Sequence, residues 1–295
     1  MKLSIPTASP LLLLAAACTG AAGPKPLASA ASGRCPDVLD YAADPDMGNR
    51  RVDFRTRETT VFAAGHSRDP GDEQFGRIAA LFAETRPTLV FFEGPDRGVR
   101  ATADQTIRET GESGYLRFLA LRAGIAVRTL EPAPAEQIRM LLRQFPSDQV
   151  FLFFVLREAA RMRDREQKKG AALDEAVTSL LGRVQTRLAG PDLPMPFTDL
   201  AGLERAFRKY WPGRDWRTAE ERWFDPKGDD AATGGVFNAA INRADSTNRN
   251  RNLVKLIVDA VTAGERPFVV IGGSHVPMVA PALECELRRI RPGAG

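Results

Sequence analysis

Only two histidines occur among the 295 residues of the chain, and each follows an apolar run that ends in one or two glycines. His66 stands in "TTVFAAGHSRDP" and His275 stands in "RPFVVIGGSHVP". A third apolar run, "LVFF", ends directly before Glu93. Two imidazoles and a carboxylate can hold a divalent metal with open positions, and without a metal they can act as general acid and base. His66, Glu93 and His275 are therefore the candidate metal ligands, and Glu93 is also a candidate catalytic residue.

The segments around these residues indicate a sheet covered by helices. Four segments are predicted to be strands, at 59–64, 88–92, 125–130 and 268–271; the first reads as a short buried strand and the second as a continuous apolar one. Helices are predicted to begin after Asp72, to cover about 101–123 and about 245–263, and to run from the last strand to about Arg289. This alternation predicts an α/β fold with a mostly parallel β-sheet flanked by helices. In such sheets ligands bind beyond the carboxyl ends of the strands, so the strand-end residues are expected to meet there.

The middle of the chain, at about 135–235, is predicted to be a helical segment within a single α/β domain that covers 36–290. The apolar block "VFLFFVL" at 150–156 is too short to span a membrane and predicts a buried helix. All three tryptophans lie between 207 and 224. This aromatic segment is expected to form either a lid over the active-site edge or a small packed cluster.

The N-terminus is typical of an exported protein. Residues 1–17 combine one lysine with a short apolar block and are predicted to be a signal peptide. The "AAAC" ending is similar to a bacterial lipobox, which makes Cys18 the expected lipidation site; ordinary cleavage near 28–30 is the alternative. Residues 18–35 would then be a lipid-anchor tether. The expected location is the bacterial cell envelope, on the periplasmic side, with a membrane anchor.

Charge and cysteine content narrow the possibilities further. The net charge is +4 and the arginines are scattered among acids, so no nucleic-acid partner is expected. Besides Cys18, the chain has Cys35 and Cys285, for which an oxidising compartment permits a disulfide; two unpaired thiols are the alternative. The sequence has no H-E-x-x-H, C-x-x-C or Walker A motif, and "GGSHV" lacks the final glycine of a nucleophile elbow, which leaves Ser274 a weak nucleophile candidate.

Four motifs, "GHSRDP", "LVFFEGP", "NRNRNLVKLI" and "FVVIGGSH", resemble the motif series of the TraB/PrgY/GumN/Tiki family, within the erythromycin esterase/ChaN-like superfamily. The resemblance covers about residues 58–287 and implies an EreA/ChaN-like α/β fold. It also implies an Arg-Asn pair that opens a late helix. Carried over by position, it implies a site made of His66, Glu93, Arg249, Asn250 and His275.

Two features of these motifs leave alternatives. The second histidine motif fits as Gly272-x-x-His275, but the first has Ala63 where the family has glycine. The repeated "RNRN" also allows Arg251 and Asn252 to take the place of the preceding pair.

The resemblance implies a hydrolase of the TraB/Tiki type. The histidines and Glu93 would hold a divalent metal ion (Mn, Co, Zn or Fe) or position a water that attacks the peptide or ester bond of a peptide or small-molecule substrate. Arg249 and Asn250 would stabilise the developing charge, and Glu131 is a further candidate ligand or base. The alternative is a ChaN-like lipoprotein that binds haem or another metal-bearing ligand without catalysis, with a cleft from the aromatic segment. A degenerate member that serves protein contacts is a third interpretation.

Overall fold

The computed structural model describes residues 34–41, 52–188 and 193–290. The expected signal peptide 1–17, the lipidation residue Cys18 and the tether up to residue 33 lie outside the described residues. One compact unit begins at Cys35 and contains the elements described below. Within the described ranges, no helix is both long and apolar enough to cross a membrane.

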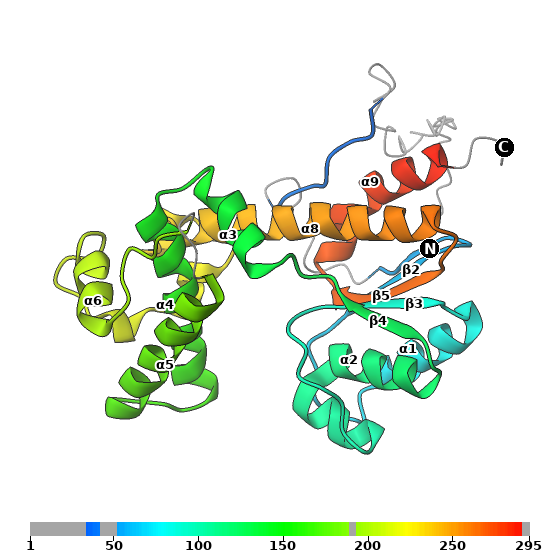
Figure 1. Ribbon diagram of the computed structural model, residues 1–295, viewed down its shortest axis with the longest axis horizontal. Coiled ribbons are helices and arrows are strands. Elements are labelled where there is room, and N and C mark those ends of the chain that lie inside the picture. The colour runs from blue at the N-terminus through cyan, green and yellow to red at the C-terminus, as the bar shows by residue number, and fades with distance from the viewer. Residues whose placement is uncertain (1–33, 42–51, 189–192, 291–295) are drawn as a thin grey trace, which may run out of the picture. The chain divides into compact units, whose positions relative to one another are not determined.

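A five-stranded sheet with the order β1-β2-β5-β3-β4 forms the centre of this unit (Figure 1). Its strands are β1 Phe54–Arg55, β2 Thr60–Ala64, β3 Leu89–Phe92, β4 Ala126–Thr129 and β5 Pro267–Gly272. β2, β5, β3 and β4 pair in parallel, whereas β1 pairs with β2 antiparallel. The prediction of a mostly parallel sheet is therefore confirmed, and the two-residue strand β1 is an addition that the apolar pattern did not indicate.

Helices cover both faces of the sheet. On one face lie α1 (Glu73–Thr85) and α2 (Ala103–Arg122), and on the other lie α8 (Asn238–Thr262) and α9 (His275–Arg289) (Figure 1). Alternate residues of β5 separate the two cores: Phe268 and Val270 belong to the cluster with α1 and α2, and Val269 and Ile271 to the cluster with α8 and α9. Burial on both faces explains why β2, β3 and β5 read as continuous apolar runs, whereas the edge strand β4 is largely exposed.

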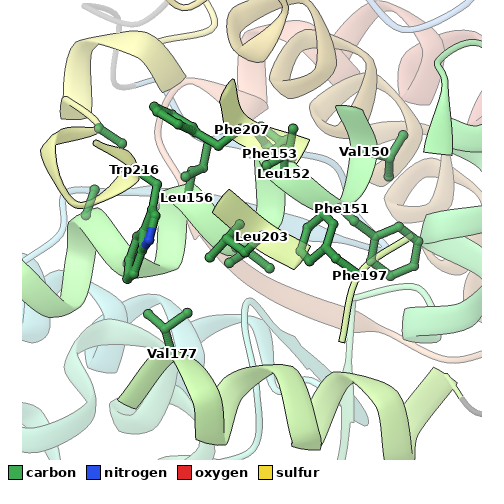
Figure 2. Packing of buried hydrophobic residues seen from close by; sticks show 14 of the residues in the cluster. Val150, Phe151, Leu152, Phe153, Leu156, Val177, Phe197, Leu203, Phe207 and Trp216 are labelled. Carbon is green, nitrogen blue, oxygen red and sulfur yellow. The ribbon is translucent and has the colours of Figure 1, made fainter. Parts of the chain in front are cut away.

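Helices also occupy the middle of the chain, as predicted. They are α3 Pro134–Leu142, α4 Ser147–Arg165, α5 Ala171–Leu188, α6 Leu200–Arg208, the 3-10 turns η2 Trp216–Thr218 and η3 Glu221–Phe224, and α7 Asp230–Thr233. Figure 2 shows α4 presenting Phe151, Phe153 and Leu156 to a core that includes Trp216 and, from α5, Val177. The apolar block at 150–156 is therefore a buried helix, not a membrane segment.

The three tryptophans belong to this same core. Trp211, Trp216 and Trp223 are each at most 3% exposed. The rings of Trp211 and Trp223 stack with centroids 5.2 Å apart and planes 2° from parallel. Because full burial of a large apolar side chain contributes roughly 1.5–3 kcal/mol, these rings stabilise the helical segment by packing. Of the two interpretations of the aromatic segment, the packed cluster is the one that the structure shows.

α8 begins earlier than the sequence predicted. The expected start near Asp245 is wrong, because Ala239 and Ile241 are fully buried and extend the helix back to Asn238. Arg249 and Asn250 consequently lie in the middle of a 25-residue helix and do not open it. The expectation that this pair sits at a helix N-terminus is therefore corrected, and no helix dipole acts through it.

A disulfide joins Cys35 to Cys285, which confirms the predicted bridge. It ties the described N-terminal segment 34–41 to α9. A backbone hydrogen bond from Leu39 N to Met278 O, 2.9 Å long, holds the same segment one turn into that helix. The beginning of the described chain is thus fixed beside the end of the sheet where β5 passes into α9.

Candidate active site at the carboxyl edge of the sheet

Each of the four parallel strands delivers one candidate residue to the same edge of the sheet. His66 follows β2, His275 follows β5, Glu93 follows β3 and Glu131 follows β4. The strand order places them across the edge in that sequence. Carboxyl ends of parallel strands are where ligands bind in open α/β sheets, so the topology alone brings these four residues together.

The first three of these side chains meet around Gly272, the last residue of β5. A Cβ atom on Gly272 would lie 3.6 Å from His66 Nε2, 3.6 Å from Glu93 Oε2 and 3.6 Å from the Cδ2 of His275. The backbone N–H of Gly272 donates a hydrogen bond of 2.8 Å to Glu93 Oε2. The missing side chain at this position therefore leaves room between both imidazoles and the carboxylate.

His275 is buried and electrically neutral. It is 7% exposed, and its Nδ1 lies 2.7 Å from Oδ1 of Asn250. An amide oxygen can only accept, so Nδ1 carries the proton and Nε2 keeps a free lone pair. The Nδ2 of Asn250 donates in turn to the sulfur of Met278, at 3.5 Å. Burial lowers the pKa of His275 to about 4, so at neutral pH the ring is neutral and carries a proton on Nδ1 only.

His66 has the opposite environment. Its side chain is 79% exposed, and its Nδ1 lies 2.8 Å from Oε1 of Glu112, a buried carboxylate on α2. This hydrogen bond raises the pKa of His66 above the ordinary value of 6.5. Gly111 makes the contact possible, because it interrupts α2 with φ of 65° and its open side lies against the backbone carbonyl of Ser67.

Arg249 links the two glutamates of the site. Its Nη2 donates to Glu93 Oε1 at 2.8 Å and to Glu131 Oε1 at 2.7 Å, and its Nε donates to Glu131 Oε2 at 2.7 Å. Burial raises the pKa of Glu93, but the charge of Arg249, followed by His275 and the Gly272 N–H, outweighs it and holds that pKa at about 2. Glu93 is therefore a fixed negative charge and not a carboxyl that exchanges protons near neutral pH.

The orientation of α8 distinguishes the two possible Arg-Asn pairs. Arg249 and Asn250 contact Glu93 and His275, as described above. Arg251 instead pairs with Asp37, and its side chain is 52% exposed. Asn252 donates to the backbone oxygen of Leu130 at 2.8 Å. The structure thus brings the first pair into the site and directs the second pair elsewhere.

The two imidazoles have the orientation that metal-bound histidines adopt. Each donates its Nδ1–H to an oxygen acceptor, Glu112 or Asn250, which leaves Nε2 available as a ligand. Glu93 can add a carboxylate oxygen, since each of its oxygens has two lone pairs and accepts one hydrogen bond here. Across residues 34–41, 52–188 and 193–290, no group of three or more histidine, cysteine or acidic side chains is already arranged as a metal site. The donor types suit a divalent cation, but the three side chains are not at ligand positions in this arrangement.

Two residues of the site, Glu112 and Tyr41, carry no clear signal in the sequence. Glu112 was one of many helix acids, although the glycine before it, inside a helical pattern, is a signal of a local irregularity. Tyr41 belongs to no motif, yet its hydroxyl lies 3.1 Å from Oγ of Ser274 and burial raises its pKa. The hydroxyl of Ser274 is thus engaged by Tyr41, and this agrees with its weak standing as a nucleophile.

A cavity of about 650 Å³ opens beside Glu93. It extends from the ends of β3 and β4 to α3, α4 and α8, and its polar lining consists of Glu93, Asp96, Thr129, Glu131, Gln137, Arg157, Asp245 and Arg249. Its size lies within the usual range for small-molecule sites, about 300–1,000 Å³. The aromatic rings expected to line a haem cleft are not in this lining, because the tryptophans are packed in the helical core.

Comparisons with family models, curated proteins and solved structures found no match for this chain. The resemblance to the TraB/PrgY/GumN/Tiki family therefore stays a prediction that its four motifs carry. The chemistry proposed for the chain rests on those motifs and on the geometry of its own residues.

Proposed function

We propose that the chain is an exported hydrolase that cleaves a peptide or ester bond at the carboxyl edge of the sheet. The observation that carries the proposal is the meeting of two histidines with opposite pKa shifts around Gly272, next to the ionised Glu93. Groups whose environments push their pKa values apart divide naturally into a proton acceptor and a proton donor. The neighbouring cavity has the size to admit a peptide segment or a small ester.

His275 has the features of the proton acceptor. Its unprotonated Nε2 would take a proton from water as the water oxygen attacks the substrate carbonyl. Glu93 stabilises the imidazolium that forms, because its negative charge favours protonation of His275. Asn250 holds the ring in the required tautomer throughout the step.

His66 has the features of the proton donor. Because Glu112 raises its pKa, the protonated ring persists to higher pH than in a free histidine, and its Nε2–H would protonate the leaving nitrogen or oxygen. Arg249 would stabilise the oxyanion through Nη1, which has no hydrogen-bond partner among the described residues. This assignment needs no further protein group.

A divalent cation held by His66, Glu93 and His275 is the second version of the same proposal. Such an ion would supply Lewis acidity to the carbonyl and would lower the pKa of a water molecule. In that version His66 is unprotonated, so the protonation state of His66 distinguishes the two mechanisms. Both versions depend on the same two histidines.

Export is supported by the Cys35–Cys285 disulfide, since such bridges persist in oxidising compartments. The lipid anchor at Cys18 is proposed on the sequence alone.

The test combines hydrolysis assays and elemental analysis of the purified protein. Aryl esters and a fluorogenic peptide library serve as substrates for the wild type, His66→Gln and His275→Gln. We expect each substitution to lower kcat by about 100-fold or more, the usual contribution of a general acid or base. Arg55→Gln is the control, because Arg55 is exposed in the same sheet but lies on the antiparallel edge strand and pairs with Glu84. Wild-type rates in both histidine variants would show the proposal to be wrong.

Metal content then separates the two mechanisms. Near-stoichiometric metal in the wild type that is lost in both histidine variants would assign the cation version. Full activity of protein dialysed against a chelator would assign the acid–base version.

A further inference from the structure

Arg157 of α4 is a cation that the proposed chemistry does not use. It lines the cavity beside Glu93 together with Arg249. Arg249 is paired with two carboxylates, as described above. Arg157, in contrast, forms no ion pair with any residue in the described part of the chain, although its side chain is largely buried. Of the two cationic residues in the cavity lining, Arg157 is therefore the one whose charge is available to a ligand.

The guanidinium of Arg157 lies near two aromatic rings and makes one hydrogen bond with a described residue. Its Cζ lies 4.9 Å from the ring centroid of Phe153 and 5.8 Å from that of Phe154. Its one hydrogen bond with a described residue runs from Nη1 to Oδ1 of Asn242, at 3.3 Å. Because this hydrogen bond uses Nη1, the Nε–H and Nη2–H groups have no partner among the described residues and can form paired bonds with a planar anion.

The charge of Arg157 is poorly compensated. Burial lowers its pKa; the opposing effect comes first from the charge of Asp245 and then from Glu158 and Glu131, none of which forms an ion pair with it. Asp245 is itself buried, and its Oδ1 accepts a hydrogen bond of 2.6 Å from Gln137. Burial also raises the pKa of Asp245. A partly buried cation without a carboxylate partner is costly, and an anion in the cavity would remove that cost.

We propose that Arg157 binds a carboxylate of the substrate, so that the hydrolase acts on peptides or esters that carry one negative charge. This inference rests on the proposed function, since it specifies the substrate of the same site. A monoanion fits because Arg157 is the one cation of the cavity lining that lacks a carboxylate partner among the described residues. Glu93 and Arg157 line the same cavity, and the two histidines lie next to Glu93 around Gly272, outside that lining. A substrate with its carboxylate on α4 would therefore extend past Glu93 to present its scissile bond to the histidines.

The test measures binding and not turnover. Calorimetry compares N-acetylphenylalanine with N-acetylphenylalanine amide, two probes that differ only in the carboxylate. We expect the wild type to bind the carboxylate about tenfold more tightly or better, as a charge-assisted hydrogen bond allows. Arg157→Gln should remove this preference, and Arg157→Lys should keep only part of it because lysine cannot bind bidentately.

Arg161→Gln is the matched control. Arg161 lies one turn further along α4 but is ion-paired with Glu158 and Glu166, so its loss should leave the preference unchanged. Equal affinity of the wild type for the two probes would overturn the inference, as would a preference that survives in Arg157→Gln. If Arg157→Gln does not fold, the wild-type comparison and the Arg157→Lys variant still test whether Arg157 binds the carboxylate. Hydrolysis without carboxylate preference would refute only this inference, whereas carboxylate preference without hydrolysis would refute only the proposed function.

Discussion

Substitution of Gly272 by alanine tests the site without removing any of its functional groups. The new Cβ would lie 3.6 Å from each of His66 Nε2, Glu93 Oε2 and His275 Cδ2, which is ordinary van der Waals contact. Gly272 does not have a positive φ, so the backbone accepts an L-residue. The methyl group would nevertheless occupy the space in which a water, a cation or a substrate carbonyl has to sit.

The expected effects on stability and on activity have opposite signs. A glycine replaced by alanine at a compatible position gains about 0.4–1 kcal/mol, because the unfolded chain loses conformational freedom. Displacement of a reacting group by about 1 Å costs about 100-fold in rate, which corresponds to about 2.7 kcal/mol of transition-state stabilisation. Gly272→Ala should therefore unfold at equal or higher denaturant concentration and hydrolyse at least about 100-fold more slowly.

The assay pairs denaturant unfolding with kcat/KM for the best substrate of the ester and peptide panel. Gly76→Ala is the control, since Gly76 lies within α1 with nothing within 4 Å of the new Cβ. The control should gain about 1 kcal/mol of stability, the difference in helix propensity, and keep its activity. Wild-type activity in Gly272→Ala would refute the reasoning, because the space around Gly272 would then not be where the reaction occurs.

Three other predictions follow from the contacts of the site. Glu112→Gln should lower the pKa of His66, measured by NMR titration of the ring, because the hydrogen bond that raises it is weakened; an unchanged pKa would contradict this. In chelator-treated protein, the free energy of unfolding of the wild type relative to His275→Gln should fall by about 2.5 kcal/mol from about pH 7.5 to about pH 4.5. The reason is that His275 binds a proton near pH 6.5 in the unfolded chain but only near pH 4 in the folded chain. Equal pH dependence of the two proteins in denaturant unfolding would refute the lowered pKa. The double variant Cys35→Ser, Cys285→Ser should lose about 2–5 kcal/mol, because the bridge closes a loop across a separation of 250 residues; an unchanged unfolding midpoint would contradict it.

The sheet and its candidate ligands could be predicted because both depend on local patterns. A strand buried on two faces reads as an unbroken apolar run, and parallel topology places every strand end at one edge. His66, Glu93 and His275 followed such runs and were therefore found from spacing alone. The start of α8 was missed for the opposite reason, since the burial of Ile241 depends on the helical core formed by distant segments.

The groups that set the protonation of the histidines could not be predicted from the sequence. Glu112 is 46 residues from His66, and Asn250 is 25 residues from His275. Contacts over such separations depend on how helices pack, which no periodicity encodes. The family resemblance supplied Asn250 but not Glu112, and neither source indicated Tyr41, which lies 233 residues from its partner Ser274.

The geometry of the cavity is set by α8, which contacts both of its sides. Near its beginning, Asn242 accepts a hydrogen bond from Arg157 of α4. Further along, Arg249 and Asn250 hold Glu93 and His275 at the sheet edge. A helix of 25 residues is about 37 Å long and nearly rigid, so it fixes the spacing between the cation on α4 and the groups at the sheet edge. A substrate that spans this distance would find both Arg157 and the groups at the sheet edge already positioned. This reduces the entropy lost when the reacting groups align.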